Sequence, residues 1–126
     1  MKTSDQPVSF KPSSGHCYNT ADSAYWEADG LSHEITRAFA LCHSCRMCFK
    51  YCDLFPLMFN LIDEKNEDVR QLTPADIRQI MKLCFQCKLC EVECPYTPRA
   101  QHEFQLDFPK LVHRYFAQQS ARVDVE

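Results

Sequence analysis

Glycine is nearly absent from this chain, which has two glycines among its 126 residues. Loops that bind phosphate groups need several glycines, because their backbone must approach the phosphate closely. Neither the G-x-G-x-x-G pattern of dinucleotide-binding folds nor the G-x-x-x-x-G-K-S/T pattern of nucleotide-binding loops occurs. The sequence therefore argues against a nucleotide or nicotinamide site built on such a loop.

Long apolar runs and blocks of one charge are also missing. No run reaches the roughly 18 apolar residues that a transmembrane helix needs, so we expect no membrane span of the chain's own. Residues 1–14 are polar and contain proline, which is unlike a secretory signal segment. The formal net charge is -3, which argues against a nucleic-acid partner. We therefore expect a cytoplasmic protein, with membrane association only through a partner.

Cysteine, in contrast, is abundant, and eight of the nine cysteines fall into two copies of one spacing. The copies are Cys42-x2-Cys45-x2-Cys48-x3-Cys52 and Cys84-x2-Cys87-x2-Cys90-x3-Cys94, and Pro95 follows the second. This spacing is the ligand pattern of bacterial ferredoxins that hold two [4Fe-4S] clusters, in which the fourth cysteine of each run ligates the other cluster. The predicted ligands are Cys42, Cys45, Cys48 and Cys94 for cluster one, and Cys84, Cys87, Cys90 and Cys52 for cluster two.

Cysteines in such numbers have two other common uses, in zinc sites and in disulfides. Structural zinc sites use two C-x2-C pairs separated by a loop, whereas here four cysteines are packed into eleven consecutive residues, twice. A disulfide framework is typical of short secreted chains, and it does not account for the duplicated spacing. The pattern favours clusters over both.

Helical signals surround both motifs, and no segment shows the alternation of a strand. We expect a helix from Ser32 to Leu41, with Ile35, Ala38, Phe39 and Cys42 on one face, and a helical turn from Arg46 to Cys52. Further helices are expected from about Pro56 onward, from Pro74 after an N-cap at Thr73, and from Pro109 to Gln118. The apolar stripe of the last helix consists of Leu111, Val112, Tyr115 and Phe116. The predicted fold class is therefore all-α, an α-helical ferredoxin. Its predicted parts are an irregular N-terminal arm (1–30), the dicluster domain (31–118) and a polar C-terminal tail (119–126).

Residues 42–52 (CHSCRMCFKYC) and 84–98 (CFQCKLCEVECPYTP) resemble the iron–sulfur domain of heterodisulfide-reductase-C-like proteins. That group includes the C subunit of anaerobic glycerol-3-phosphate dehydrogenase. The resemblance departs at Asp53, where family members often carry proline. Longer relatives continue into C-C-G repeats, which this chain does not show, so the resemblance implies either a stand-alone carrier or a second chain with that domain.

These observations favour an electron-transfer subunit over an enzyme, because all eight motif cysteines are used as ligands and leave no open iron. A structural or sensing cluster is the other alternative. The expected partner is a redox protein: a flavoprotein, a C-C-G-domain protein or a membrane cytochrome subunit. Outside the motifs, Cys17 is either an uninvolved thiol or a contact to a partner's redox site. His43 is expected beside a cluster or facing solvent, and His102 and His113 on the surface.

Overall fold

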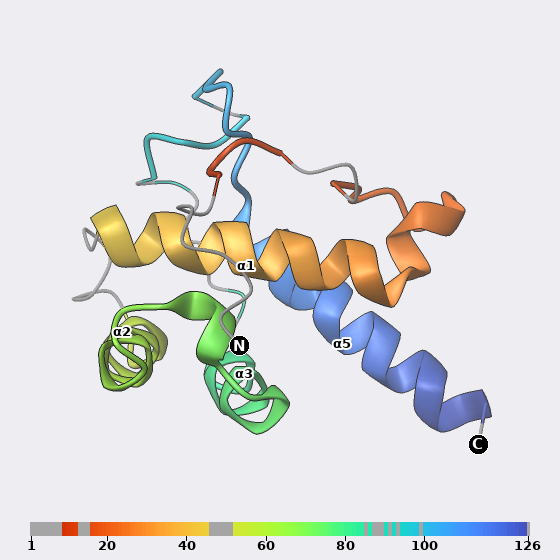
Figure 1. The fold of residues 1–126 in the computed structure, drawn as a ribbon. Helices are drawn as coiled ribbons and strands as arrows, with labels where there is room; N and C mark the ends of the chain where they lie inside the picture. The colour runs from red at the N-terminus through yellow and green to blue at the C-terminus, as the bar shows by residue number, and fades with distance from the viewer. Residues whose placement is uncertain are drawn as a thin grey trace.

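The regular elements of the computed structural model are all helices within the part of the chain that it describes (Figure 1). It describes residues 9–12, 16–45, 52–84, 86, 90, 92, 94–98 and 100–125, with side chains up to residue 120. The elements are η1 (Ser23–Trp26), α1 (Ala28–Cys45), α2 (Leu54–Glu64), η2 (Val69–Gln71), α3 (Pro74–Met81) and α5 (Phe108–Val125). The predicted all-α fold is confirmed. No described helix is long and apolar enough to cross a membrane. The turn predicted for residues 46–52 lies outside the described residues, except for Cys52.

Helix α1 crosses the middle of the molecule (Figure 1). Helices α2 and α3 lie on one side of it, and the irregular segments that precede α1 and α5 lie on the other. The predicted apolar face is confirmed, because Ile35, Ala38 and Phe39 are all buried. The helix begins before and ends after its predicted bounds. Asp29 in its first turn favours the earlier start, because a negative charge is stabilised near the positive end of the helix dipole.

Helices α2 and α3 begin at the local signals that predicted them. Pro56 lies in the first turn of α2, where its missing N–H group is not needed. Thr73 caps α3: its hydroxyl accepts from the Asp76 N–H at 3.1 Å, and the Asp76 carboxylate accepts from the Thr73 N–H at 3.1 Å. This reciprocal capping box satisfies two N–H groups that have no partner within the helix. The box fixes the start of the helix that leads to Cys84.

Helix α5 is longer than predicted and buries a different face. It runs from Phe108 to Val125, past the predicted end at Gln118. The predicted stripe is buried at Leu111, Val112 and Tyr115 but is wrong for Phe116, which is 38% exposed. The buried face instead includes two polar residues, Arg114 and Gln118.

These two polar side chains bind carbonyl groups of η1. Arg114 donates to the Tyr25 oxygen at 2.9 Å and to the Ala24 oxygen at 2.7 Å. Gln118 donates to the same Tyr25 oxygen at 2.9 Å. A polar side chain can be buried at low cost when its donors are satisfied in this way. These hydrogen bonds connect η1 to α5, and Tyr25 of η1 is buried.

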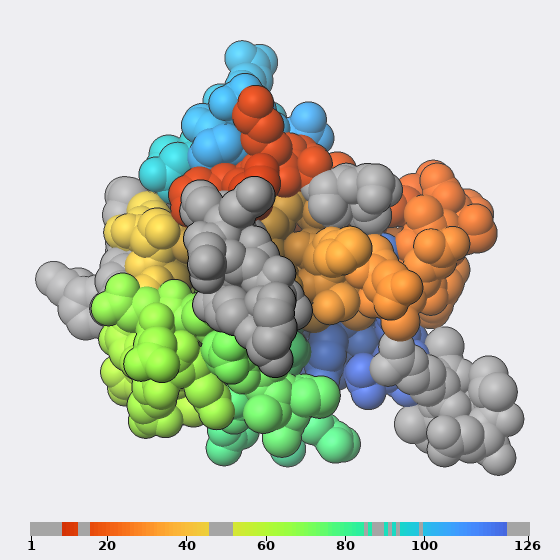
Figure 2. Space-filling model, viewed as in Figure 1, coloured from red at the N-terminus to blue at the C-terminus, as the bar shows by residue number. Residues whose placement is uncertain are grey.

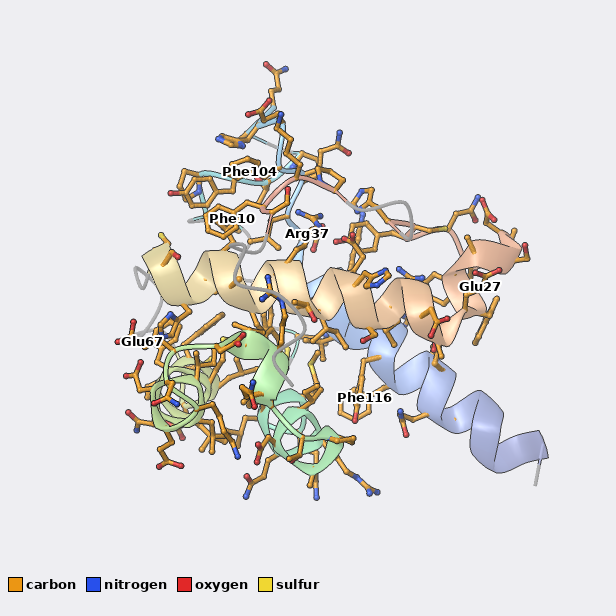
Figure 3. All side chains as sticks on the ribbon, in the orientation of Figure 1. Phe10, Glu27, Arg37, Glu67, Phe104 and Phe116 are labelled. Atoms are coloured by element: carbon orange, nitrogen blue, oxygen red, sulfur yellow. The ribbon has the colours of Figure 1, made fainter. Side chains whose placement is uncertain are left out.

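The described part of the N-terminal segment packs on the domain itself. The ring of Phe10 meets the ring of Phe104 edge to face, with centroids 5.8 Å apart (Figure 3). Figure 2 shows this segment, in red, against the segment that precedes α5, in blue, on one end of the molecule. The His16 ring lies 3.1 Å from the Glu34 carboxylate of α1. These contacts join residues that are far apart in the sequence, so local periodicity could not indicate them.

Arg37 of α1 bonds to two other segments on this side of the molecule. Its side chain is 3% exposed and forms an ion pair with Glu34 at 2.8 Å. It also donates to the carbonyl oxygens of Phe10 and Phe104, both at 2.8 Å. Arg37, Phe10 and Phe104 belong to three separate segments of the chain (Figure 3). A buried guanidinium needs several acceptors to offset the loss of its hydration. Arg37 therefore fastens the N-terminal segment and the segment before α5 to α1.

Replacement of Arg37 by methionine should lower the free energy of unfolding by about 3–5 kcal/mol, because it leaves the buried Glu34 carboxylate without its guanidinium partner. The measurement is urea unfolding of the anaerobically prepared protein, followed by circular dichroism. Arg78→Met is the matched control. Arg78 is an exposed cation on α3, so its loss should change stability by no more than about 0.5 kcal/mol. Equal effects of the two substitutions would contradict the role given to Arg37.

Candidate metal centre

Six of the eight motif cysteines lie in the described residues, and each is partly buried. Cys48 and Cys87 lie outside them. Five of the six pack against the apolar core that α1, α2, α3 and α5 share. These five are Cys42, Cys52, Cys84, Cys90 and Cys94. The motifs therefore meet the core and are not carried on an isolated loop.

The two motifs begin differently. Cys42 and Cys45 belong to the last turn of α1, where they stand three positions apart on one face of the helix. The sequence predicted that this helix ends at Leu41, before both cysteines. Cys84, in contrast, follows the end of α3 and has no helical neighbour on its C-terminal side at Gln86. The first two cysteines of one motif therefore lie on a helix, whereas the first cysteine of the other motif follows the end of a helix.

Several N–H groups point at cysteine sulfurs. The backbone N–H of Gln86 donates to Cys84 Sγ at 3.4 Å, and its side-chain Nε2 donates to the same sulfur at 3.6 Å. The backbone N–H of Tyr96 donates to Cys94 Sγ at 3.4 Å. A thiolate is a much better acceptor than a thiol, and hydrogen bonds to sulfur are one of the ways in which proteins set cluster potentials. These sulfurs are surrounded as metal-bound thiolates would be.

Tyr96 brings the first motif and the end of the second into one neighbourhood. The charge of Cys45, a hydrogen bond with the same side chain, and burial raise the pKa of the Tyr96 hydroxyl, and the charge of Cys94 adds to this. Charges act on a titratable group mainly at short range in water. Cys45 and Cys94 therefore both lie near the Tyr96 side chain, and ligation of one cluster by both cysteines would need such proximity. The ligand assignment itself stays a prediction.

Zinc sites and four-iron clusters place their ligands differently. Within the described ranges, no three His, Cys, Asp or Glu side chains lie close enough together to hold one metal ion. A zinc site gathers all its ligands on one ion, whereas each cysteine of a four-iron cluster binds a different iron atom. Each predicted ligand set also includes one cysteine, Cys48 or Cys87, outside the described ranges. The partly buried thiols, their apolar surroundings and their N–H donors fit a cluster.

His43, in the first motif, connects two helices. Its Nε2 lies 2.8 Å from the Asp63 carboxylate, so it joins the end of α1 to the end of α2. Its ring meets Phe59 edge to face, with centroids 6.1 Å apart. His43 was expected beside a cluster or facing solvent; its side chain is 13% exposed and has Asp63 as a partner, and its position relative to a cluster stays a prediction. Arg46, Lys50 and Lys88, which the sequence also places in or beside the motifs, lie outside the described residues.

Sequence reasoning missed two residues that contact cysteines, Gln86 and Tyr96. It also gave His102 no role, whereas its ring packs against those of Tyr96 and Phe104, with centroids 5.0 Å and 4.5 Å away. Cys17 lies in the segment before η1, and its thiol is 3.7 Å from the Asn19 oxygen. The one available signal was position: Gln86 and Tyr96 each stand two residues after a motif cysteine.

Comparison with known proteins gives one match to a family model. Residues 41–97 match the 4Fe-4S dicluster domain. This match, with helices on both sides of the motifs in the described residues, agrees with the predicted α-helical ferredoxin fold. This part of the chain is thus similar to a domain that carries two iron–sulfur clusters.

One curated relative is citrate utilization protein B of Escherichia coli, which is 30% identical over 95 residues. The matched region covers 70% of this chain and 22% of that protein, so the chain spans about a fifth of its relative's length. No solved structure gives a significant match.

Substitution of Cys94 by serine should damage the cluster that the first motif holds, because Cys94 is its predicted fourth ligand. We expect the electron paramagnetic resonance signal of that cluster to be lost or altered in the reduced protein, while the second cluster keeps its signal. Cys17→Ser is the control, because Cys17 lies outside both motifs and should leave both signals unchanged. Damage confined to the second cluster would refute the crossed ligation.

Proposed function

We propose that this chain is an electron-transfer subunit that relays single electrons through two [4Fe-4S] clusters, to or from a partner oxidoreductase subunit. The observation that carries the proposal is the dicluster match over residues 41–97, on a fold in which both motifs meet one core. Two clusters in one small domain lie close enough for electrons to pass between them. A structural or sensing role would not account for the second copy of the cysteine motif.

The cofactor supplies one-electron exchange, and the protein's residues determine where and how readily that exchange occurs. Under the proposed ligation, Cys42, Cys45, Cys48 and Cys94 hold one cluster, and Cys84, Cys87, Cys90 and Cys52 hold the other. The apolar side chains of α2, including the buried Phe55 and Met58, keep water away from this region. A dry surrounding and N–H groups aimed at sulfur are the means by which a protein tunes a cluster.

The resemblance to heterodisulfide-reductase-C-like subunits favours a partner that performs the chemistry. On this proposal the partner is a flavoprotein, a C-C-G-domain protein or a membrane cytochrome subunit, and the complex works in the cytoplasm or on the cytoplasmic face of a membrane. The short match to a much longer relative supports the same view, because the region shared with citrate utilization protein B is a small part of that protein. The catalytic chemistry of such a complex would then be carried by parts of it outside the shared region.

Protein purified without oxygen from its native source should contain about eight irons and eight acid-labile sulfides per chain, since two cubane clusters hold four of each. After reduction, the paramagnetic resonance spectrum should show two clusters that interact magnetically. Zinc in place of iron, with no labile sulfide, would refute the proposal. Four irons per chain and a single uncoupled signal would refute the relay between two clusters.

A partner isolated with the chain provides the functional test. We expect an oxidoreductase subunit to copurify, and its reduced form should reduce the clusters of the separately purified chain in stopped-flow measurements. The Cys94→Ser variant is the matched control, because its first-motif cluster is damaged while the helices remain. A copurifying protein without redox activity would favour the structural or sensing role.

A further inference from the structure

Gln86 has an unusual backbone conformation in the second cysteine motif. It stands between Cys84 and Cys87, and its φ angle is 61°. This left-handed conformation is uncommon for a residue other than glycine and is found where the surrounding structure requires it. Here it aims the backbone N–H of Gln86 back at Cys84 Sγ, 3.4 Å away.

The side chain of Gln86 turns toward the same sulfur. Its Nε2 atom is 3.6 Å from Cys84 Sγ and 2.9 Å from the carbonyl oxygen of Pro109, in the first turn of α5. The orientation of the amide follows from its partners. A carbonyl oxygen can only accept, so the nitrogen and not the oxygen of the amide must face Pro109. One N–H of the amide then serves Pro109, and the other is available to the sulfur.

The first motif differs from the second at the position that matches Gln86. This position, between Cys42 and Cys45, is Ser44, which lies within α1 and is exposed. The N–H of a residue inside a helix bonds to a carbonyl one turn earlier and is not available to a sulfur. The backbone donation that Gln86 makes is therefore not available to Ser44.

We propose that Gln86 is a tuning residue that raises the reduction potential of the cluster bound by Cys84. This inference rests on the proposed function. Reduction adds negative charge to the cluster and its thiolates, and donors aimed at a thiolate stabilise the more negative state more strongly. The cluster of the second motif is therefore easier to reduce than it would be without Gln86.

The test is a redox titration of Gln86→Met and Gln86→Glu, followed by paramagnetic resonance. Methionine keeps an unbranched side chain of similar length but has no N–H donor, whereas glutamate keeps the shape and adds a negative charge. With methionine, we expect the equilibrium constant for reduction of one cluster to fall about three- to tenfold. A tenfold change equals about 59 mV for a one-electron couple. Glutamate should lower it further, and the other cluster should not change.

Two controls make the result specific. Gln79→Met makes the same replacement at an exposed position of α3 and should shift neither cluster. Cys84→Ser identifies which signal belongs to the second motif, and the shifted signal must be that one. A merely structural role for Gln86 predicts loss of cluster without an ordered change from glutamine to methionine to glutamate.

A measurement on the unsubstituted protein keeps the inference testable if the variants lose their cluster. Protein labelled with 15N only in glutamine side chains should show, in pulsed paramagnetic resonance, a coupling between a side-chain nitrogen and one reduced cluster. Absence of that coupling, or an unchanged potential in Gln86→Met, overturns the role of Gln86 and leaves the electron-transfer proposal intact. Absence of clusters from the unsubstituted protein overturns the electron-transfer proposal itself.

Discussion

The ion pair between Glu34 and Arg37 is the interaction on which the arrangement of the rest depends. Helix α1 is covered on both sides, so its charged residues must find partners inside the protein. Arg37 does this by binding Glu34 and carbonyl groups of two distant segments. One of these segments, at Phe104, follows directly after the second cysteine motif. The same guanidinium therefore fixes the position of α1, which ends in Cys42 and Cys45, relative to the region that contains Cys94 and Tyr96.

Local features of the fold could be predicted from the sequence, and the long-range ones could not. The start of α3 depends on residues at its own first turn, Thr73, Pro74 and Asp76, and the prediction was confirmed. The buried face of α5 depends instead on which partners its side chains meet. Phe116 was expected inside because it is apolar, yet Arg114 and Gln118 took the buried positions because η1 offers carbonyl acceptors there. Sequence periodicity carries no information about such acceptors.

The candidate site shows the same division. The spacing of the cysteines indicates the cofactor, since it reflects how one loop can reach several corners of a cluster. It does not indicate the neighbours that donate to the sulfurs. The left-handed backbone of Gln86 directs its N–H group to Cys84, and Tyr96 lies near Cys45, which is far from it in the sequence. Both depend on the folded path of the chain, which the spacing does not specify.

The hydrogen bond between Gln86 and Pro109 has a mechanical consequence. A single amide group connects the sulfur of Cys84 to the first turn of α5, so the two cannot be displaced independently. Helix α5 is in turn fastened to η1 through Arg114 and Gln118. A force applied to the far end of this chain of contacts, at the surface around η1, would be transmitted as a small movement of a hydrogen-bond donor beside a sulfur atom.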